Sequence, residues 1–188
     1  MTTPELPRLK LPLGIQNLAK LRQQGCYYVD KTGLAIDLIE AGSAYFLSRP
    51  RRFGKSLLVD TLKELFEGNQ ALFTGLAAES RWNWSTRHPV IRIDLGAGEV
   101  RSRDELELRL HEIVDDHVRR LGLTLHNQSL SGRFGELIHA AAVQAGQRAV
   151  VLVDEYDKPI LDNLADRETA AVMRDTLRSF YSVLKSAD

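Results

Sequence analysis

One stretch of this sequence, residues 44–66, constrains the fold more than any other. It reads AYFLSRPRRFGKSLLVDTLKELF and begins with four apolar residues, 44–47, that have the length and composition of a buried strand. A basic turn follows, then the triplet Gly54-Lys55-Ser56, and then apolar residues at close to helical spacing. The order of strand, basic loop, Gly-Lys-Ser and helix predicts a phosphate-binding loop.

The chemistry of a helix start explains why this loop would bind a nucleotide such as ATP. The first N–H groups of a helix have no acceptor within the helix, and the helix dipole adds positive potential there. A phosphate group satisfies both. We expect Lys55 to reach the terminal phosphates and the Ser56 hydroxyl to bind Mg²⁺. The residues expected to contact the nucleotide are Arg51, Arg52, Phe53, Gly54, Lys55, Ser56 and Leu57.

The loop departs from the usual pattern at one position, because Arg49 stands where the first glycine is normally found. A Gly-Lys-Ser triplet also occurs at helix starts that bind no ligand, and this alternative stays open. The two arginines of the loop, Arg51 and Arg52, either contact phosphate or neutralise charge within the loop.

A second segment, residues 147–155, reads QRAVVLVDE and ends an apolar run with two carboxylates. Such a run is typical of a strand buried on both faces of a parallel sheet. Its carboxyl end is where open α/β sheets bind ligands. We expect Asp154 to hold magnesium together with Ser56, and Glu155 to polarise the attacking water. The alternative is a strand that ends in two solvated acids.

The two segments together resemble a known family. RPRRFGKS with VLVDEYDKP is similar to the AAA-ATPase-like family of prokaryotes, which also lacks the first glycine of the loop. The segments LPLGIQ, YYVDKT, HPVIRIDL and RDTLRSFYSVLKS resemble the same family, so the similarity runs from about Leu11 to the last residue.

This resemblance implies a P-loop NTPase core, a three-layer αβα fold with a mostly parallel sheet. A glutamate after the magnesium aspartate implies an additional strand that would follow Asp188 and carry a residue sensing the γ-phosphate. We therefore expect residues 1–188 to form a single domain with an incomplete sheet, the N-terminal part of a longer protein. Residues 1–26 would be a lead-in segment and residues 27–188 the nucleotide-binding core. Family members often continue into a C-terminal PD-(D/E)XK nuclease-like domain, and nothing of that domain is expected here.

The composition limits the classes of binding partner that this chain is expected to have. The 188 residues carry 25 basic and 25 acidic side chains, so the net charge is zero and there is no overall basic signal for nucleic acid. No apolar run is long enough to span a bilayer, which predicts no membrane partner. The single cysteine, Cys26, excludes an intrachain disulfide and fits a reducing cytoplasm.

Three functions compete. The first is ATP binding with Mg²⁺-dependent hydrolysis, coupled to a conformational change or a partner domain, with Lys55 and Glu155 as catalytic residues. The second is a nucleotide-gated binding module that barely hydrolyses ATP. The third is a nucleic-acid-associated protein, with contacts made through the turn of Arg49, Arg51 and Arg52 or through regions outside this chain. A homo-oligomer or a C-terminal effector domain would be the partner.

The remaining pattern predicts several elements. Residues 89–95 read as a strand with Asp94 near its carboxyl end, either supporting the site or simply solvated. Residues 28–32 either contribute to an adenine pocket or pack a helix on the sheet. Helices are expected over about residues 15–24, 30–39, 103–120, 131–145 and 167–185.

Overall fold

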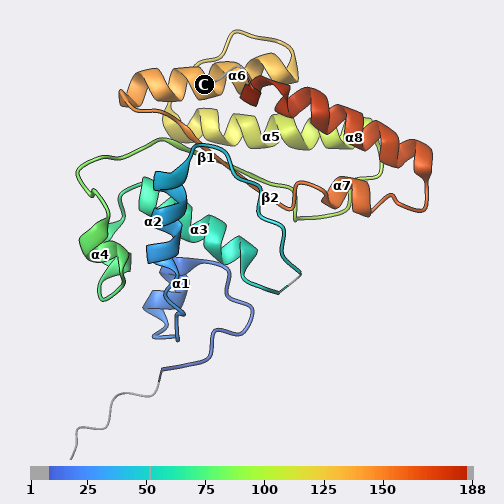
Figure 1. Ribbon diagram of the computed structural model, residues 1–188. Helices are drawn as coiled ribbons and strands as arrows, with labels where there is room; N and C mark the ends of the chain where they lie inside the picture. Colours follow the sequence, from blue (N-terminus) through green and yellow to red (C-terminus); the bar gives the residue numbers. More distant parts are fainter. Residues whose placement is uncertain (1–8, 51, 186–188) are drawn as a thin grey trace, which may run out of the picture. The chain divides into compact units, whose positions relative to one another are not determined.

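The computed structural model describes residues 9–50 and 52–185, and the chain divides into two compact units, Met1–Thr86 and Arg87–Asp188 (Figure 1). Each unit has its own hydrophobic core. Among the described residues, no helix combines the length and apolarity needed to cross a membrane.

The first unit is helical in its described part. Its core gathers buried side chains from the short helices and from the turn that follows the longest one. The predicted helices over about residues 15–24 and 30–39 are confirmed with shifted ends, and the helix after the Gly-Lys-Ser triplet is confirmed. The elements are α1 (Leu18–Gln23), α2 (Thr32–Ala41), α3 (Lys55–Phe66), the 3₁₀ helix η1 (Gln70–Phe73) and α4 (Ala78–Arg81).

The strand predicted over residues 44–47 is not formed, so that prediction is wrong. Residues 44–50 have no regular secondary structure, and Tyr45, Phe46 and Leu47 are 51%, 71% and 46% exposed. A strand requires a neighbouring strand to bond with. The described part of this unit contains an isolated bridge between Lys10 and Cys26 but no strand.

The second unit is a mixed α/β structure with a two-stranded parallel sheet, which confirms the α/β class. Strands β1 and β2 pair in register, with Val90 opposite Val150 and Asp94 opposite Asp154. Two long helices connect the strands, as a parallel connection requires. The elements are β1 (Val90–Asp94), α5 (Arg103–Leu121), α6 (Leu130–Ala145), β2 (Val150–Asp154), α7 (Lys158–Leu161), α8 (Arg167–Tyr181) and the 3₁₀ helix η2 (Ser182–Lys185).

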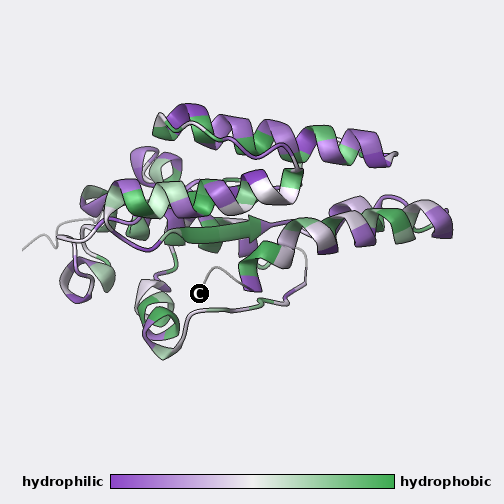
Figure 2. Ribbon diagram, turned by 90° about the horizontal axis from the view of Figure 1, so that it is seen from above, coloured by the Kyte–Doolittle hydropathy of each residue, from purple (hydrophilic) through white to green (hydrophobic). Residues whose placement is uncertain are grey.

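The core of the second unit lies between β1 and the three long helices α5, α6 and α8. Phe134 of α6 and Phe180 of α8 stack with ring centroids 4.4 Å apart. Figure 2 shows the strong apolar character of the sheet beside helices of mixed polarity. Residues 150–153 of β2 are only half-buried, although their apolar run predicted burial on both faces. In a two-stranded sheet β2 is an edge strand, which accounts for the difference.

Candidate functional site

The Gly-Lys-Ser triplet begins a helix, as the sequence predicted. Gly54 has a left-handed backbone with φ of 79° and directly precedes Lys55, the first residue of α3. A glycine fits there because a side chain disfavours this conformation. Arg52 also has a left-handed backbone, with φ of 67°, so the loop turns sharply twice within three residues. Arg51, predicted to contact the nucleotide, lies outside the described residues.

The Lys55 side chain turns back over its own loop. Its Nζ donates a hydrogen bond to the backbone carbonyl of Arg49, at 2.8 Å. Arg49 thus stands in the position of the usual first glycine and contributes a backbone oxygen to this contact. The ammonium group is therefore held at the start of α3.

The N-terminus of α3 is not capped by a side chain. The short helices α4 and α7 likewise lack such a cap, whereas α1, α5, α6 and α8 each donate a backbone N–H to a capping side chain, that of Asn17, Ser102, Ser129 and Asp166 respectively. The first N–H groups of a helix need partners from outside it. At α3 these groups belong to Lys55, Ser56 and Leu57, which are half-buried, while Arg52 and Phe53 are exposed.

The body of α3 is fixed within the first unit by buried polar contacts. The Asp60 carboxylate, which is 2% exposed, accepts hydrogen bonds from the backbone N–H of Leu18 at 2.7 Å and from the Asn17 amide at 3.3 Å. The Tyr28 hydroxyl lies 3.3 Å from the Thr61 hydroxyl. These contacts join the body of α3 to α1 and to Tyr28.

The contacts of Asp30 and Thr32 are accounted for by packing. Asp30 accepts hydrogen bonds from the Thr32 N–H and hydroxyl at 2.9 and 2.7 Å, and from the Ala77 N–H at 2.7 Å. The Thr32 hydroxyl in turn accepts from the Ala78 N–H at 3.0 Å. Both side chains thereby join the start of α2 to the start of α4, and the adenine role for this segment stays a prediction.

We expect Asp30→Ala to destabilise the first unit by on the order of 1 kcal/mol, because three hydrogen bonds to a carboxylate are lost. Burial raises the pKa of the Asp30 carboxyl, but hydrogen bonds from Thr32 and Ala77 outweigh it, so its pKa lies below the ordinary value of 3.8. A depressed carboxyl pKa stabilises the fold above the unfolded pKa, and this contribution is lost as pH falls through the folded value.

Thermal unfolding of wild type and Asp30→Ala at pH 7 and pH 3 measures this effect. The difference in Tm should be clear at pH 7 and smaller at pH 3. Asp37→Ala is the control, since Asp37 pairs with Arg81 on the surface and should matter less. Equal Tm values for wild type and Asp30→Ala at pH 7 would contradict the packing role.

In the second unit, the two strands deliver two aspartates side by side. Asp154 ends β2 and is 5% exposed, and its register partner Asp94 ends β1. Arg92 lies between them, with its guanidinium 3.2 Å from the Asp94 Oδ2 and 3.6 Å from the Asp154 Oδ2. One positive charge thus faces both carboxylates, so Asp94 has a charged partner at the strand end.

Glu155 follows Asp154 in a sharp turn. Its backbone is left-handed with φ of 50°, which is uncommon for a residue with a side chain. Its N–H donates to the Asp154 Oδ1 at 3.1 Å, and its carbonyl accepts from the Lys158 N–H at 3.1 Å. These two bonds hold the turn and direct the polypeptide into α7.

Sequence reasoning missed Arg92, Gly96 and Lys158. Side chains alternate between the two faces of a strand, so Arg92 and Asp94 lie on the same face of β1. The sequence could therefore have indicated their contact. The proximity of Arg92 to Asp154 depends on the strand register, which the sequence does not reveal. Gly96 lies in the loop after β1, and Lys158, the first residue of α7, contacts that loop at Gly98, a contact that joins residues distant in the sequence.

The predicted site residues form two groups, each within its own unit. Lys55 and Ser56 lie in the first turn of α3, and Asp154 and Glu155 lie at the end of β2. Within the described parts of the chain, no three histidine, cysteine or acidic side chains gather in a way that could hold a metal. Ser56 and Asp154 carry hard oxygen donors of the kind that Mg²⁺ binds, and their joint role as magnesium ligands stays a prediction.

Comparison with known proteins gives a consistent result. The family described as Predicted AAA-ATPase matches residues 12–188. A protein of Azotobacter chroococcum mcd 1, described as an uncharacterized protein in the vnfD 5′ region, is 54% identical over 184 residues. The match covers 97% of this chain and 36% of that protein, so the chain spans about a third of its length. No solved structure matches the chain.

Proposed function

Because the chain belongs to the Predicted AAA-ATPase family, which indicates nucleotide binding, we propose that it binds ATP with Mg²⁺ and hydrolyses it. The family match includes both the Gly-Lys-Ser loop and the Asp154-Glu155 strand end. The proposal requires that the two groups act on one nucleotide.

The main support for this proposal is the geometry at the start of α3. A left-handed Gly54 directly precedes the helix, the Lys55 ammonium lies at the loop, and no side chain caps the helix. Uncapped N–H groups beside a positive side chain favour an anion. The β- and γ-phosphates of ATP are the anions proposed, held by Lys55 and the loop N–H groups, with Arg52 as an added contact.

The proposed chemistry assigns a role to each remaining group. Ser56 and Asp154 would hold Mg²⁺, which neutralises charge on the phosphates. Glu155 would accept a hydrogen bond from the attacking water and orient it. Catalysis would therefore rest on positioning and on charge stabilisation.

Within the α/β class, we also propose a more specific fold, a three-layer P-loop core whose sheet continues beyond β1 and β2. Half-buried apolar residues at 150–153 support it, because a further strand on that edge would cover them. The greater length of the Azotobacter relative supports coupling of the ATPase to a further domain.

A calorimetric titration of the protein with ATP, at saturating Mg²⁺, tests the proposal. Binding with a dissociation constant in the micromolar range, weakened when EDTA removes Mg²⁺, is the expected result. Parallel titration with GTP measures the base preference. Absence of binding at millimolar ATP would refute the proposed function.

A further inference from the structure

We propose that Lys158 and Asn163 are positioning residues for Glu155, acting through the loop of residues 95–101 that follows β1. This inference rests on the proposed ATPase function. It assigns a role to the residues just after the Asp-Glu pair, which otherwise only turn the chain.

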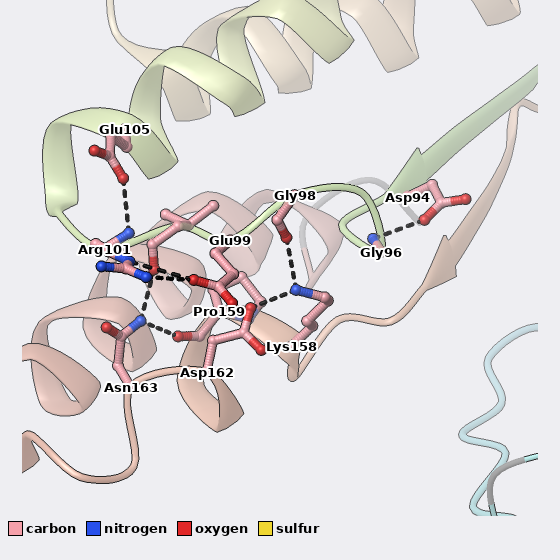
Figure 3. Close-up of polar contacts among 11 residues, drawn as sticks. Asp94, Gly96, Gly98, Glu99, Arg101, Glu105, Lys158, Pro159, Asp162 and Asn163 are labelled. Carbon is pink, nitrogen blue, oxygen red and sulfur yellow. Dashed lines mark hydrogen bonds and ion pairs between the residues drawn. The ribbon is translucent and has the colours of Figure 1, made fainter.

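Lys158 holds the middle of the 95–101 loop. Its Nζ donates a hydrogen bond to the carbonyl of Gly98 at 2.6 Å and forms an ion pair with Asp162 one helical turn further along. The Lys158 side chain is 25% exposed and the Asp162 side chain 26%, so both side chains are partly buried. Figure 3 shows the side chain of Lys158, the first residue of α7, bonded to Gly98 of the loop and to Asp162.

Asn163 holds the same loop two residues further on. Its Nδ2 donates to the carbonyl of Val100 at 2.7 Å and to the carbonyl of Pro159 at 2.8 Å (Figure 3). One amide group therefore joins the loop to the segment that contains Lys158. Two donors from the α7 region thus fix the backbone of the loop at Gly98 and Val100.

The other end of the loop is fixed to the strands. The Leu95 N–H donates to the Asp154 carbonyl at 3.3 Å, and the Gly96 N–H donates to the Asp94 Oδ1 at 2.8 Å. The loop therefore starts beside both strand-end aspartates and is then held by Lys158 and Asn163.

Gly96 brings this loop against Glu155. A Cβ placed on Gly96 would lie 2.9 Å from the Asp94 Oδ1 and 3.3 Å from the Glu155 Cγ. The first distance is shorter than real contacts allow, and the second leaves little room to move. The backbone at Gly96 is thus one wall of the space that the Glu155 side chain occupies.

Lys158 fixes Glu155 from two directions. Its backbone N–H binds the Glu155 carbonyl, and its ammonium binds the loop that packs on the Glu155 side chain. Without the ammonium contact, the loop could move away and leave the carboxylate free to adopt other orientations. A general base that is poorly oriented slows the chemical step without weakening nucleotide binding.

The test compares Lys158→Met with wild type in steady-state ATP hydrolysis and in ATP binding. We expect kcat to fall by about tenfold and the dissociation constant for ATP to stay within about twofold, since misorientation costs rate. Lys158→Arg should restore most of the rate, because a guanidinium can also donate to Gly98 and pair with Asp162. Arg103→Met is the control, as it removes an exposed ion pair with Glu107 in the same unit.

A second variant covers the case in which Lys158→Met fails to fold. Gly96→Ala places a methyl group against the Glu155 side chain and should lower kcat in the same way, with ATP binding retained. Amide hydrogen exchange at residues 96–100 should rise in Lys158→Met and stay unchanged in Arg103→Met.

The outcomes separate this inference from the function on which it rests. If wild type binds no ATP or shows no turnover, the proposed ATPase and the positioning role both fail. If wild type hydrolyses ATP and both Lys158→Met and Gly96→Ala match its kcat, the positioning role alone is overturned. Parallel losses of kcat and ATP affinity in Lys158→Met would also overturn it, since they indicate general structural damage.

Discussion

Replacing Lys55 with alanine should weaken ATP binding by about 10- to 100-fold. An ammonium bound to phosphate forms charge-assisted hydrogen bonds, each contributing about 1.5–3 kcal/mol, and every 1.4 kcal/mol is a factor of about ten in affinity. The contact shown for Lys55 is its bond to the Arg49 carbonyl. Because this bond lies at the loop, the variant is expected to fold normally.

Calorimetric titrations of wild type, Lys55→Ala and Lys20→Ala measure the effect. Lys20→Ala is the matched control, because it removes an exposed lysine from α1 in the same unit. It should bind ATP like wild type, and all three proteins should unfold at similar temperatures. Equal isotherms for wild type and Lys55→Ala would show that the start of α3 is not the phosphate site.

The helices could be predicted because their signals are local. Ser102 and Ser129 cap α5 and α6, and Gly122 and Gly146 end them with left-handed backbones. The start of α3 could also be predicted from the sequence, since Gly54 supplies the left-handed turn that precedes Lys55. Caps and glycine turns act within a few residues, so the sequence alone contains the needed information.

Local sequence signals could not decide whether residues 44–47 form a strand. Apolar composition shows that a segment can be a strand, but hydrogen bonding to another strand decides whether it becomes one. Strands β1 and β2 have such partners in each other, and their predicted positions are confirmed.

The sequence could predict which residues form the candidate site, but not which other residues contact them. The Asp154-Glu155 pair at the end of an apolar run was visible in the sequence. The position of Arg92 beside Asp154 follows from pairing Asp94 with Asp154, which is a matter of register. The contact of Lys158 with Gly98 joins residues 60 positions apart, and no local pattern indicates it.

Replacing Glu155 with glutamine should abolish most ATP turnover and leave ATP binding intact. A general base typically contributes about 10²- to 10⁴-fold to the rate, and glutamine keeps the size of the side chain but cannot accept a proton. The backbone bonds of Glu155, to the Asp154 carboxylate and from the Lys158 N–H, do not involve its side chain. The turn should therefore survive the substitution, and kcat should fall by at least about 100-fold at an unchanged dissociation constant for ATP.

Phosphate release and ATP binding are measured on the same preparations of wild type, Glu155→Gln and Glu168→Gln. Glu168→Gln is the control, because Glu168 is an exposed acid in the first turn of α8 and should leave both quantities unchanged. If wild type binds ATP but releases no phosphate above the rate of Glu155→Gln, the chain is a nucleotide-gated binding module. Turnover lost only in Glu155→Gln would instead assign the chemical step to the carboxylate that follows β2, because binding and folding are held constant in the comparison.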